Sequence, residues 1–138
     1  MPRNRFPPCR VFGLVLLGLL AGCGGDGPQP LKTHAVKGKV VYKDDNQPLT
    51  AGTVEFQSTT DPNLNGRGDV DDKGGFVLYT IVGNKKQPGV AEGTYRVTVL
   101  PPMGPDQLAQ AIDLPGTVVV TADGPNDFTL TIPGRARR

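Results

Sequence analysis

The sequence predicts an all-β domain, an antiparallel sandwich or barrel. From about residue 34 onward, apolar residues alternate with polar ones in short runs, which is the pattern of strands with one buried face. Clusters of Gly, Pro, Asn and Asp separate these runs and favour turns. The 138 residues include 19 Gly and 14 Pro, too many helix breakers for a long helical bundle.

The first expected strand covers residues 36–42 and ends at an Asp- and Asn-containing turn over residues 44–48. The second covers residues 53–57. It alternates cleanly, with Val54 and Phe56 on the face that turns inward.

A weaker strand follows at residues 67–70 and ends at the turn 71–75, which holds two Asp and two Gly. The next expected strand is residues 76–79, a loop follows through Gly89, and Gly93 opens the strand after it. The strand after that loop, residues 94–99, has three apolar residues on one face.

The last part of the domain begins with residues 103–116, where one short helical turn is expected around residues 107–111. Residues 117–121 and 128–132 are expected to close the domain as a hairpin around residues 123–126. Fifteen side chains form the expected core: Val36, Val40, Leu49, Val54, Phe56, Phe76, Leu78, Tyr95, Val97, Val99, Val118, Val120, Phe128, Leu130 and Ile132.

The N-terminal segment has the pattern of a signal peptide. Residues 1–10 carry Arg3, Arg5 and Arg10 and no acid, and residues 11–21 are apolar or Gly. Eleven residues as a helix span about 16 Å, whereas the hydrocarbon core of a bilayer is about 30 Å thick. A stable transmembrane helix is therefore not expected, and a buried core helix is disfavoured by the run's N-terminal position.

The residues that end this run, Leu20-Ala21-Gly22-Cys23, resemble the lipobox of bacterial lipoprotein signal peptides. The resemblance implies cleavage before Cys23, a diacylglyceryl group on its sulfur and usually an acyl chain, such as palmitate, on its amine. The alternative is a free Cys after an ordinary signal peptide. Gly24 follows where an Asp would favour inner-membrane retention in Gram-negative bacteria, so the resemblance favours the outer membrane in a cell that has one.

Four segments are therefore expected: a signal peptide (1–22), a lipidated tether (23–33), the sandwich (34–133) and a basic tail (134–138). The tether is rich in Gly and Pro, and ten such residues span roughly 17–19 Å as a coil. Cleavage removes Cys9 and three Arg, so the formal charge falls from +2 to −1. A charge this small does not indicate a nucleic-acid partner.

Several segments of the domain resemble carboxypeptidase-regulatory-like domains. They are Val36-x-Gly38-x-Val40, Gln47-Pro48-Leu49, Gly52 to Phe56, Asp72 to Phe76, and Gly93 to Val99. The resemblance covers about residues 35–132 and implies a seven-stranded Greek-key sandwich of the transthyretin-like, or prealbumin-like, type. The usual Asp-x-x-Gly-x-Phe turn has an extra Gly here, Gly74-Gly75, so the register of that hairpin is open by one residue.

Three nearby carboxylates, Asp69, Asp71 and Asp72, suggest a calcium loop. An EF-hand loop requires a ligand at its fifth position and Glu at its twelfth. Counted from Asp69 these positions are Lys73 and Thr80, so the match fails and a solvated turn is favoured. A weak cation contact at the Asp69–Asp72 turn stays open, and no metal or cofactor is assigned.

No catalytic site is expected. His34 and Ser58 are the only His and the only Ser, and a Ser-His-acid site would need both in one cleft. The tripeptide Arg67-Gly68-Asp69 is interpreted as the start of a strand rather than as an integrin motif. The ureide hydrolases of the transthyretin-like fold carry several His and a Tyr-Arg-Gly-Ser terminus, and this chain has neither.

Two functional hypotheses follow. The first is a membrane-anchored, non-catalytic envelope lipoprotein whose sandwich binds or scaffolds an envelope protein or glycan. The second is a small transthyretin-like hydrolase. An exposed aromatic platform would favour a glycan, with Tyr42 and Tyr79 as candidates, and edge-strand pairing would favour a protein.

Overall fold

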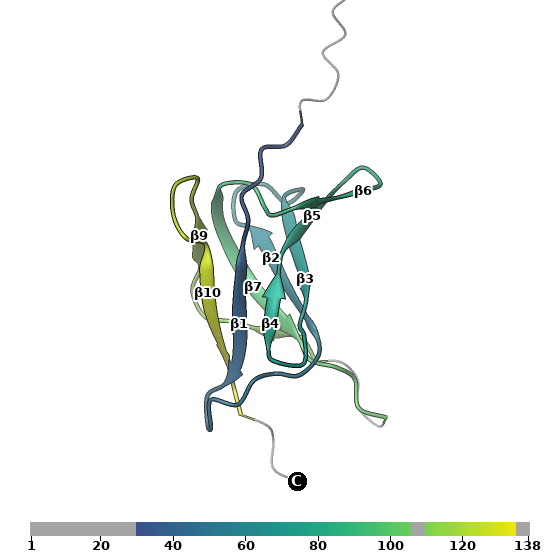
Figure 1. The fold of residues 1–138 in the computed structure, drawn as a ribbon, viewed down its shortest axis with the longest axis vertical. Coiled ribbons are helices and arrows are strands. Elements are labelled where there is room, and N and C mark those ends of the chain that lie inside the picture. The colour runs from purple at the N-terminus through teal and green to yellow at the C-terminus, as the bar shows by residue number, and fades with distance from the viewer. Residues whose placement is uncertain (1–29, 106–109, 135–138) are drawn as a thin grey trace, which may run out of the picture.

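The computed structural model describes residues 30–105 and 110–134. The proposed signal peptide, Cys23 and most of the tether lie outside these residues, as does the basic tail beyond Gly134. Within the described part, the protein is all-β, and no helix there could span a membrane. The predicted fold class is confirmed, but the described residues form ten strands rather than seven. Figure 1 shows how these strands are arranged.

The strands form two sheets that face each other across one core. Their bounds are β1 (Lys37–Tyr42), β2 (Thr53–Ser58), β3 (Asn65–Asp69), β4 (Gly75–Val77), β5 (Tyr79–Val82), β6 (Lys85–Pro88), β7 (Gly93–Leu100), β8 (Ile112–Asp113), β9 (Val118–Val120) and β10 (Asp127–Ile132). The small sheet has the order β10-β1-β4, and the large sheet has the order β6-β5-β3-β2-β7-β8, with β9 also paired to β7. Only β1 and β10 pair in parallel; the other described strand pairs are antiparallel.

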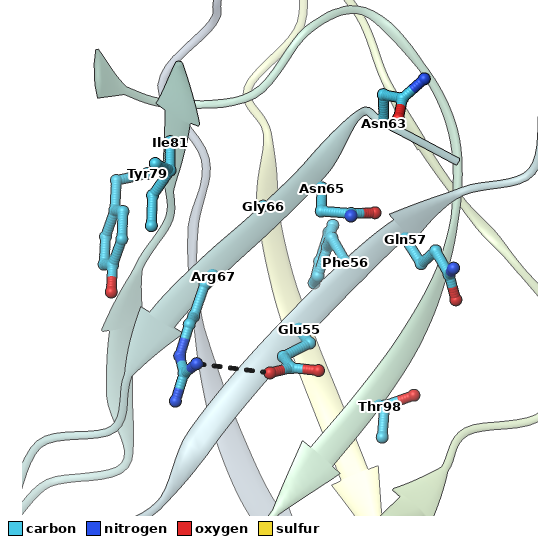
Figure 2. A pocket seen from close by; sticks show the side chains of 10 residues that line it. All are labelled: Glu55, Phe56, Gln57, Asn63, Asn65, Gly66, Arg67, Tyr79, Ile81 and Thr98. Carbon is cyan, nitrogen blue, oxygen red and sulfur yellow. Dashed lines mark ion pairs between the residues drawn. The ribbon is translucent and has the colours of Figure 1, made fainter. Parts of the chain in front are cut away.

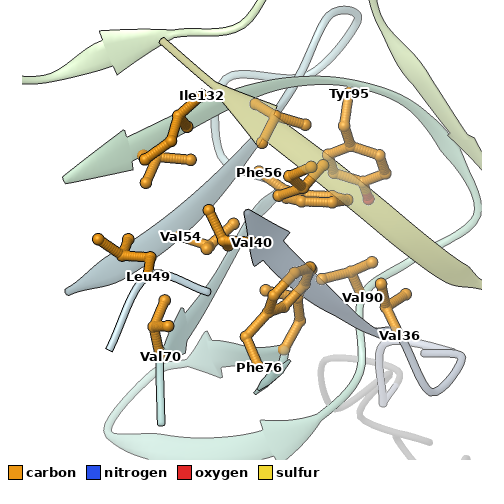
Figure 3. Close-up of a cluster of buried hydrophobic side chains, with 14 of the residues drawn as sticks. Val36, Val40, Leu49, Val54, Phe56, Val70, Phe76, Val90, Tyr95 and Ile132 are labelled. Atoms are coloured by element: carbon orange, nitrogen blue, oxygen red, sulfur yellow. The ribbon is translucent and has the colours of Figure 1, made fainter. Parts of the chain in front are cut away.

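The core lies between the sheets and is centred on aromatic rings (Figure 3). The Phe56 ring from the large sheet lies 6.3 Å from Phe76 and 5.9 Å from Phe128, both of the small sheet, and 6.0 Å from Tyr95. All of the expected core residues are buried except Val118 and Phe128, which are half-buried and pack against the cluster. The core also contains Val70 and Val90, which the sequence pattern did not single out.

The expected strand 76–79 is divided at Leu78. Gly75–Val77 forms β4 beside β1, and Tyr79–Val82 forms β5 beside β3, so the chain crosses from the small sheet to the large one. Leu78 itself is buried, and its N–H donates to the carbonyl of Val36 while its own carbonyl accepts from Gly89 N–H. The period-2 pattern continues through this crossing, which is why the sequence shows one strand where the structure has two.

The loop expected after residue 79 contains a second strand. β5 and β6 form a hairpin in which Val82 pairs with Lys85, leaving a two-residue turn of Gly83 and Asn84. Gly83 has φ +61°, as favoured at the first central position of a II′ hairpin turn. β6 was missed because its sequence, Lys-Lys-Gln-Pro, has no apolar alternation.

The expected hairpin of residues 117–121 and 128–132 is wrong. β9 pairs with β7 in the large sheet, and β10 pairs in parallel with β1 in the small sheet. The buried Asn126 redirects the chain between them, because its side-chain amide accepts from Thr121 N–H and donates to the Thr121 carbonyl. These two bonds close the turn through a side chain, so the two strands need not pair.

The short helical turn expected around residues 107–111 is not seen in its described part. Gln110 and Ala111 are irregular and lead into β8, while residues 106–109 lie outside the described chain.

Candidate functional site

The outer face of the large sheet carries a shallow groove with a volume of about 400 Å³, lined mostly by outward-facing side chains. We call it the outer groove; Figure 2 shows its lining. It lies over β2, β3 and β5 with β7 at one side, because burial of Val54 and Phe56 turns their neighbours on β2 outward. The lining residues are Glu55, Phe56, Gln57, Asn63, Asn65, Gly66, Arg67, Tyr79, Ile81 and Thr98.

One row of directly paired residues crosses this face from strand to strand. Asp113 pairs with Thr98, Thr98 with Glu55, Glu55 with Arg67, and Arg67 with Tyr79. Paired residues share a face of a sheet, so these five side chains form one continuous cross-sheet row. The row brings together residues from five strands, β8, β7, β2, β3 and β5.

The cross-sheet row contains one ion pair and one hydrogen bond to a carboxylate. The Arg67 guanidinium lies 3.7 Å from a carboxylate oxygen of Glu55, with both side chains about half exposed (Figure 2). The Thr98 hydroxyl donates to the Asp113 carboxylate over 2.7 Å. An exposed ion pair of this kind contributes at most about 1 kcal/mol to stability, so its groups are available to a polar ligand at small cost.

Tyr79 supplies the partly exposed aromatic ring of the groove, whereas the ring of Phe56 is fully buried. Tyr79 is half-buried on β5, and the Lys86 ammonium lies 4.3 Å from its ring centroid in a cation–π contact. Tyr42, the other candidate for an aromatic platform, is half-buried in β1 of the small sheet. The two tyrosines therefore do not form one platform.

The acidic turn is built around Asp71. One Asp71 carboxylate oxygen accepts hydrogen bonds from the backbone N–H groups of Lys73 and Gly75, as a turn-forming Asp does. Gly74 takes φ +82°, and Gly75 begins β4 opposite Lys39, which fixes the register that the extra Gly left open. Within the described residues, no group of three or more Asp, Glu, His or Cys is placed to hold a metal ion.

The other residues considered as candidates for catalysis or binding make hydrogen bonds that support the fold. The Ser58 hydroxyl, at the end of β2, accepts from the backbone N–H groups of Thr60 and Asp61 and so shapes the loop that follows. His34 lies ahead of β1, where its backbone bridges to Val90. Residues 67–69 lie within β3, paired to β2, as expected for a strand. Cys23 lies outside the described residues.

A comparison with protein-family models finds no match, and searches of curated proteins and of solved structures likewise find none.

The outer groove was not predicted as a site, although Tyr79 was considered as an exposed aromatic. Alternation along each strand shows which residues point outward. The register that aligns Glu55, Arg67 and Tyr79 depends on pairing between strands and on the division at Leu78. No local sequence signal carries that information.

Proposed function

We propose that this protein is a non-catalytic envelope lipoprotein, anchored by acylated Cys23, whose sandwich binds an envelope protein or glycan through the outer groove. The anchoring rests on the positive segment, the apolar run and the Leu20–Cys23 lipobox in that order. Two or more acyl chains on one residue hold a protein stably at a membrane. The carboxypeptidase-regulatory-like pattern supports a transthyretin-like ancestry for the sandwich.

The observation that carries the binding function is the cross-sheet row in the outer groove. Arg67 and Glu55, whose side chains end in planar polar groups, follow the ring of Tyr79 in this row, and Gln57 lies on the far side of the groove (Figure 2). Planar polar groups next to an aromatic surface suit a polar ligand with an apolar face, such as a sugar ring or an extended peptide.

Photo-crosslinking in the native envelope tests this function. A benzophenone amino acid replaces Gln57 in the groove, or Thr129 on the exposed face of β10 as the matched control. We expect a discrete crosslinked product from position 57 that is absent at position 129 and is reduced by Arg67→Ala. Equal labelling at the two positions would contradict binding through the groove, and protease or glycosidase digestion of the product identifies the partner's class.

A further inference from the structure

The β5–β6 hairpin extends beyond the body of the sandwich (Figure 1). Thr80 is its last buried residue, and the six residues from Ile81 to Lys86 are all exposed. The exposed fractions of Ile81 and Val82 are 59% and 41%, although they are consecutive in the chain. A strand that covers a core exposes only every second residue, so Ile81 and Val82 lie beyond the core. Ile81 borders the outer groove, and Lys86 lies over the Tyr79 ring.

The charge of the tip is positive. Lys85 and Lys86 follow the two apolar residues across the turn, and neither forms an ion pair with a described residue. Apolar side chains next to Lys are the composition of segments that lie in the interface of a bilayer.

The chain that leads from Cys23 is fastened beside this hairpin. Thr33 Oγ1 donates to the carbonyl of Pro88 over 2.7 Å, and the Gln87 side-chain amide donates to the carbonyl of Leu31. His34 and Val90 then exchange backbone hydrogen bonds of 2.8 and 3.0 Å. Figure 1 shows the described chain entering the domain at the same end as β6, with the C-terminal side at the opposite end.

The length of the preceding chain sets how far this end can lie from the membrane. Leu31 is eight residues after Cys23, and eight residues span at most about 26–29 Å even when fully extended. A lipid-anchored Cys23 therefore keeps the end of the sandwich that carries the hairpin within that distance of the bilayer surface.

We propose that the β5–β6 hairpin is a second membrane contact, in which Ile81 and Val82 enter the lipid interface and Lys85 and Lys86 contact anionic lipid phosphates. This inference rests on the proposed anchor at Cys23. The loops that join β2 to β3, β6 to β7 and β9 to β10 lie at the same end (Figure 1), and their sequences contain Asp61, Glu92 and Asp123. Anionic lipid repels these carboxylates, which favours an orientation with the hairpin toward the membrane.

A second copy of the chain is the competing occupant, and the hairpin is poorly suited to it. Pairing along the outer edge of β6 would bring Lys85 and Lys86 of two chains together. Pro88 has no N–H to donate, and residues 31–33 already hydrogen-bond to the Gln87–Pro88 end of the strand.

Fluorescence quenching on the lipidated protein tests the inference. The protein is reconstituted into vesicles of phosphatidylcholine alone or with 30% phosphatidylglycerol, and a fluorophore is attached to Val82→Cys or, as the far-end control, to Asp45→Cys. Cleavage removes Cys9 and acylation occupies Cys23, so each variant has one reactive thiol. We expect nitroxide lipids to quench position 82 at least twofold more than position 45, and more strongly with the anionic lipid.

Charge variants show whether Lys85 and Lys86 cause the stronger quenching with anionic lipid. Lys85→Gln with Lys86→Gln should abolish the effect of the anionic lipid, whereas Lys43→Gln with Lys73→Gln, away from the hairpin, should leave it unchanged. Equal quenching at positions 82 and 45 on acylated protein would overturn the hairpin contact alone. Shielding of position 82 from aqueous iodide without lipid quenching would assign the hairpin to a second copy. A mass spectrum showing unacylated Cys23 would overturn both the anchor and this inference.

Discussion

Backbone hydrogen bonds between His34 and Val90 tie the beginning of the domain to the segment between β6 and β7. His34 N–H donates to the Val90 carbonyl and Val90 N–H donates to the His34 carbonyl, at 2.8 and 3.0 Å. β1, which begins three residues after His34, belongs to the small sheet. Thr33 also donates to the carbonyl of Pro88 in β6, so the chain that leads into β1 bonds to a strand of the large sheet as well.

Gly89→Ala should break this tie. Gly89 has φ +83°, and a Cβ there would overlap the carbonyl group of His34. Left-handed strain and two weakened hydrogen bonds together should lower the free energy of unfolding by about 2–5 kcal/mol, measured by urea denaturation. Gly83→Ala is the matched control, because φ there is +61° but no atom lies within 4 Å. It should cost only about 1–2 kcal/mol, and equal losses would argue against a role for the His34–Val90 tie.

Phe56→Ala should be among the most damaging substitutions in the core. Phe56 is fully buried, and its ring meets three other rings from both sheets. Truncation of a buried Phe lowers the free energy of unfolding by about 3–5 kcal/mol, and Phe56→Leu should cost less because it leaves a smaller cavity. A thermal melt in which both variants unfold at the wild-type temperature would contradict this view of the core.

Asn126→Ala should loosen the crossing between β9 and β10. The side chain both accepts from Thr121 N–H and donates to the Thr121 carbonyl. Loss of both bonds at a buried site should cost about 1–3 kcal/mol in chemical denaturation. Asn126→Asp keeps the acceptor but places a second carboxylate oxygen against the Thr121 carbonyl, so it should also be less stable than the wild type. If the Asn126→Ala protein is as stable as the wild type, the Asn126 side chain does not hold this turn.

The free energy of unfolding should depend on pH above 10 because the Tyr95 hydroxyl is buried. Burial raises the pKa of Tyr95 above its ordinary value near 10, and the hydroxyl donates to the Ala91 carbonyl over 2.7 Å. The neutral form is thus favoured in the folded state. The protonated Tyr95 side chain contributes fully to stability below pH 10, and this contribution is lost as pH rises toward the higher folded-state pKa.

The test compares the free energy of unfolding of the wild type with that of Tyr95→Phe from pH 8 to 11.5. The stability advantage of the wild type over this variant should shrink above about pH 10. Parallel stability curves for the two proteins would exclude an alkaline contribution from Tyr95.

The sequence predicted the parts of the fold that depend on local alternation. The inward faces of β2 and β7 and nearly all core residues follow from period-2 patterning. The change of sheet at Leu78 and the partners of β9 and β10 were not predicted, because they depend on pairing between distant strands. The outer groove depends on the same pairing, since Glu55, Arg67 and Tyr79 come together only once three strands are in register.

The central claim is anchoring through Cys23, and metabolic labelling with radioactive palmitate in a bacterial host tests it most directly. Wild type and Cys9→Ser, which changes the Cys of the expected signal peptide, should both carry label and sediment with the membrane fraction. Cys23→Ser should carry none, and the protein should be released or remain as uncleaved precursor. Unchanged labelling of Cys23→Ser would contradict the claim.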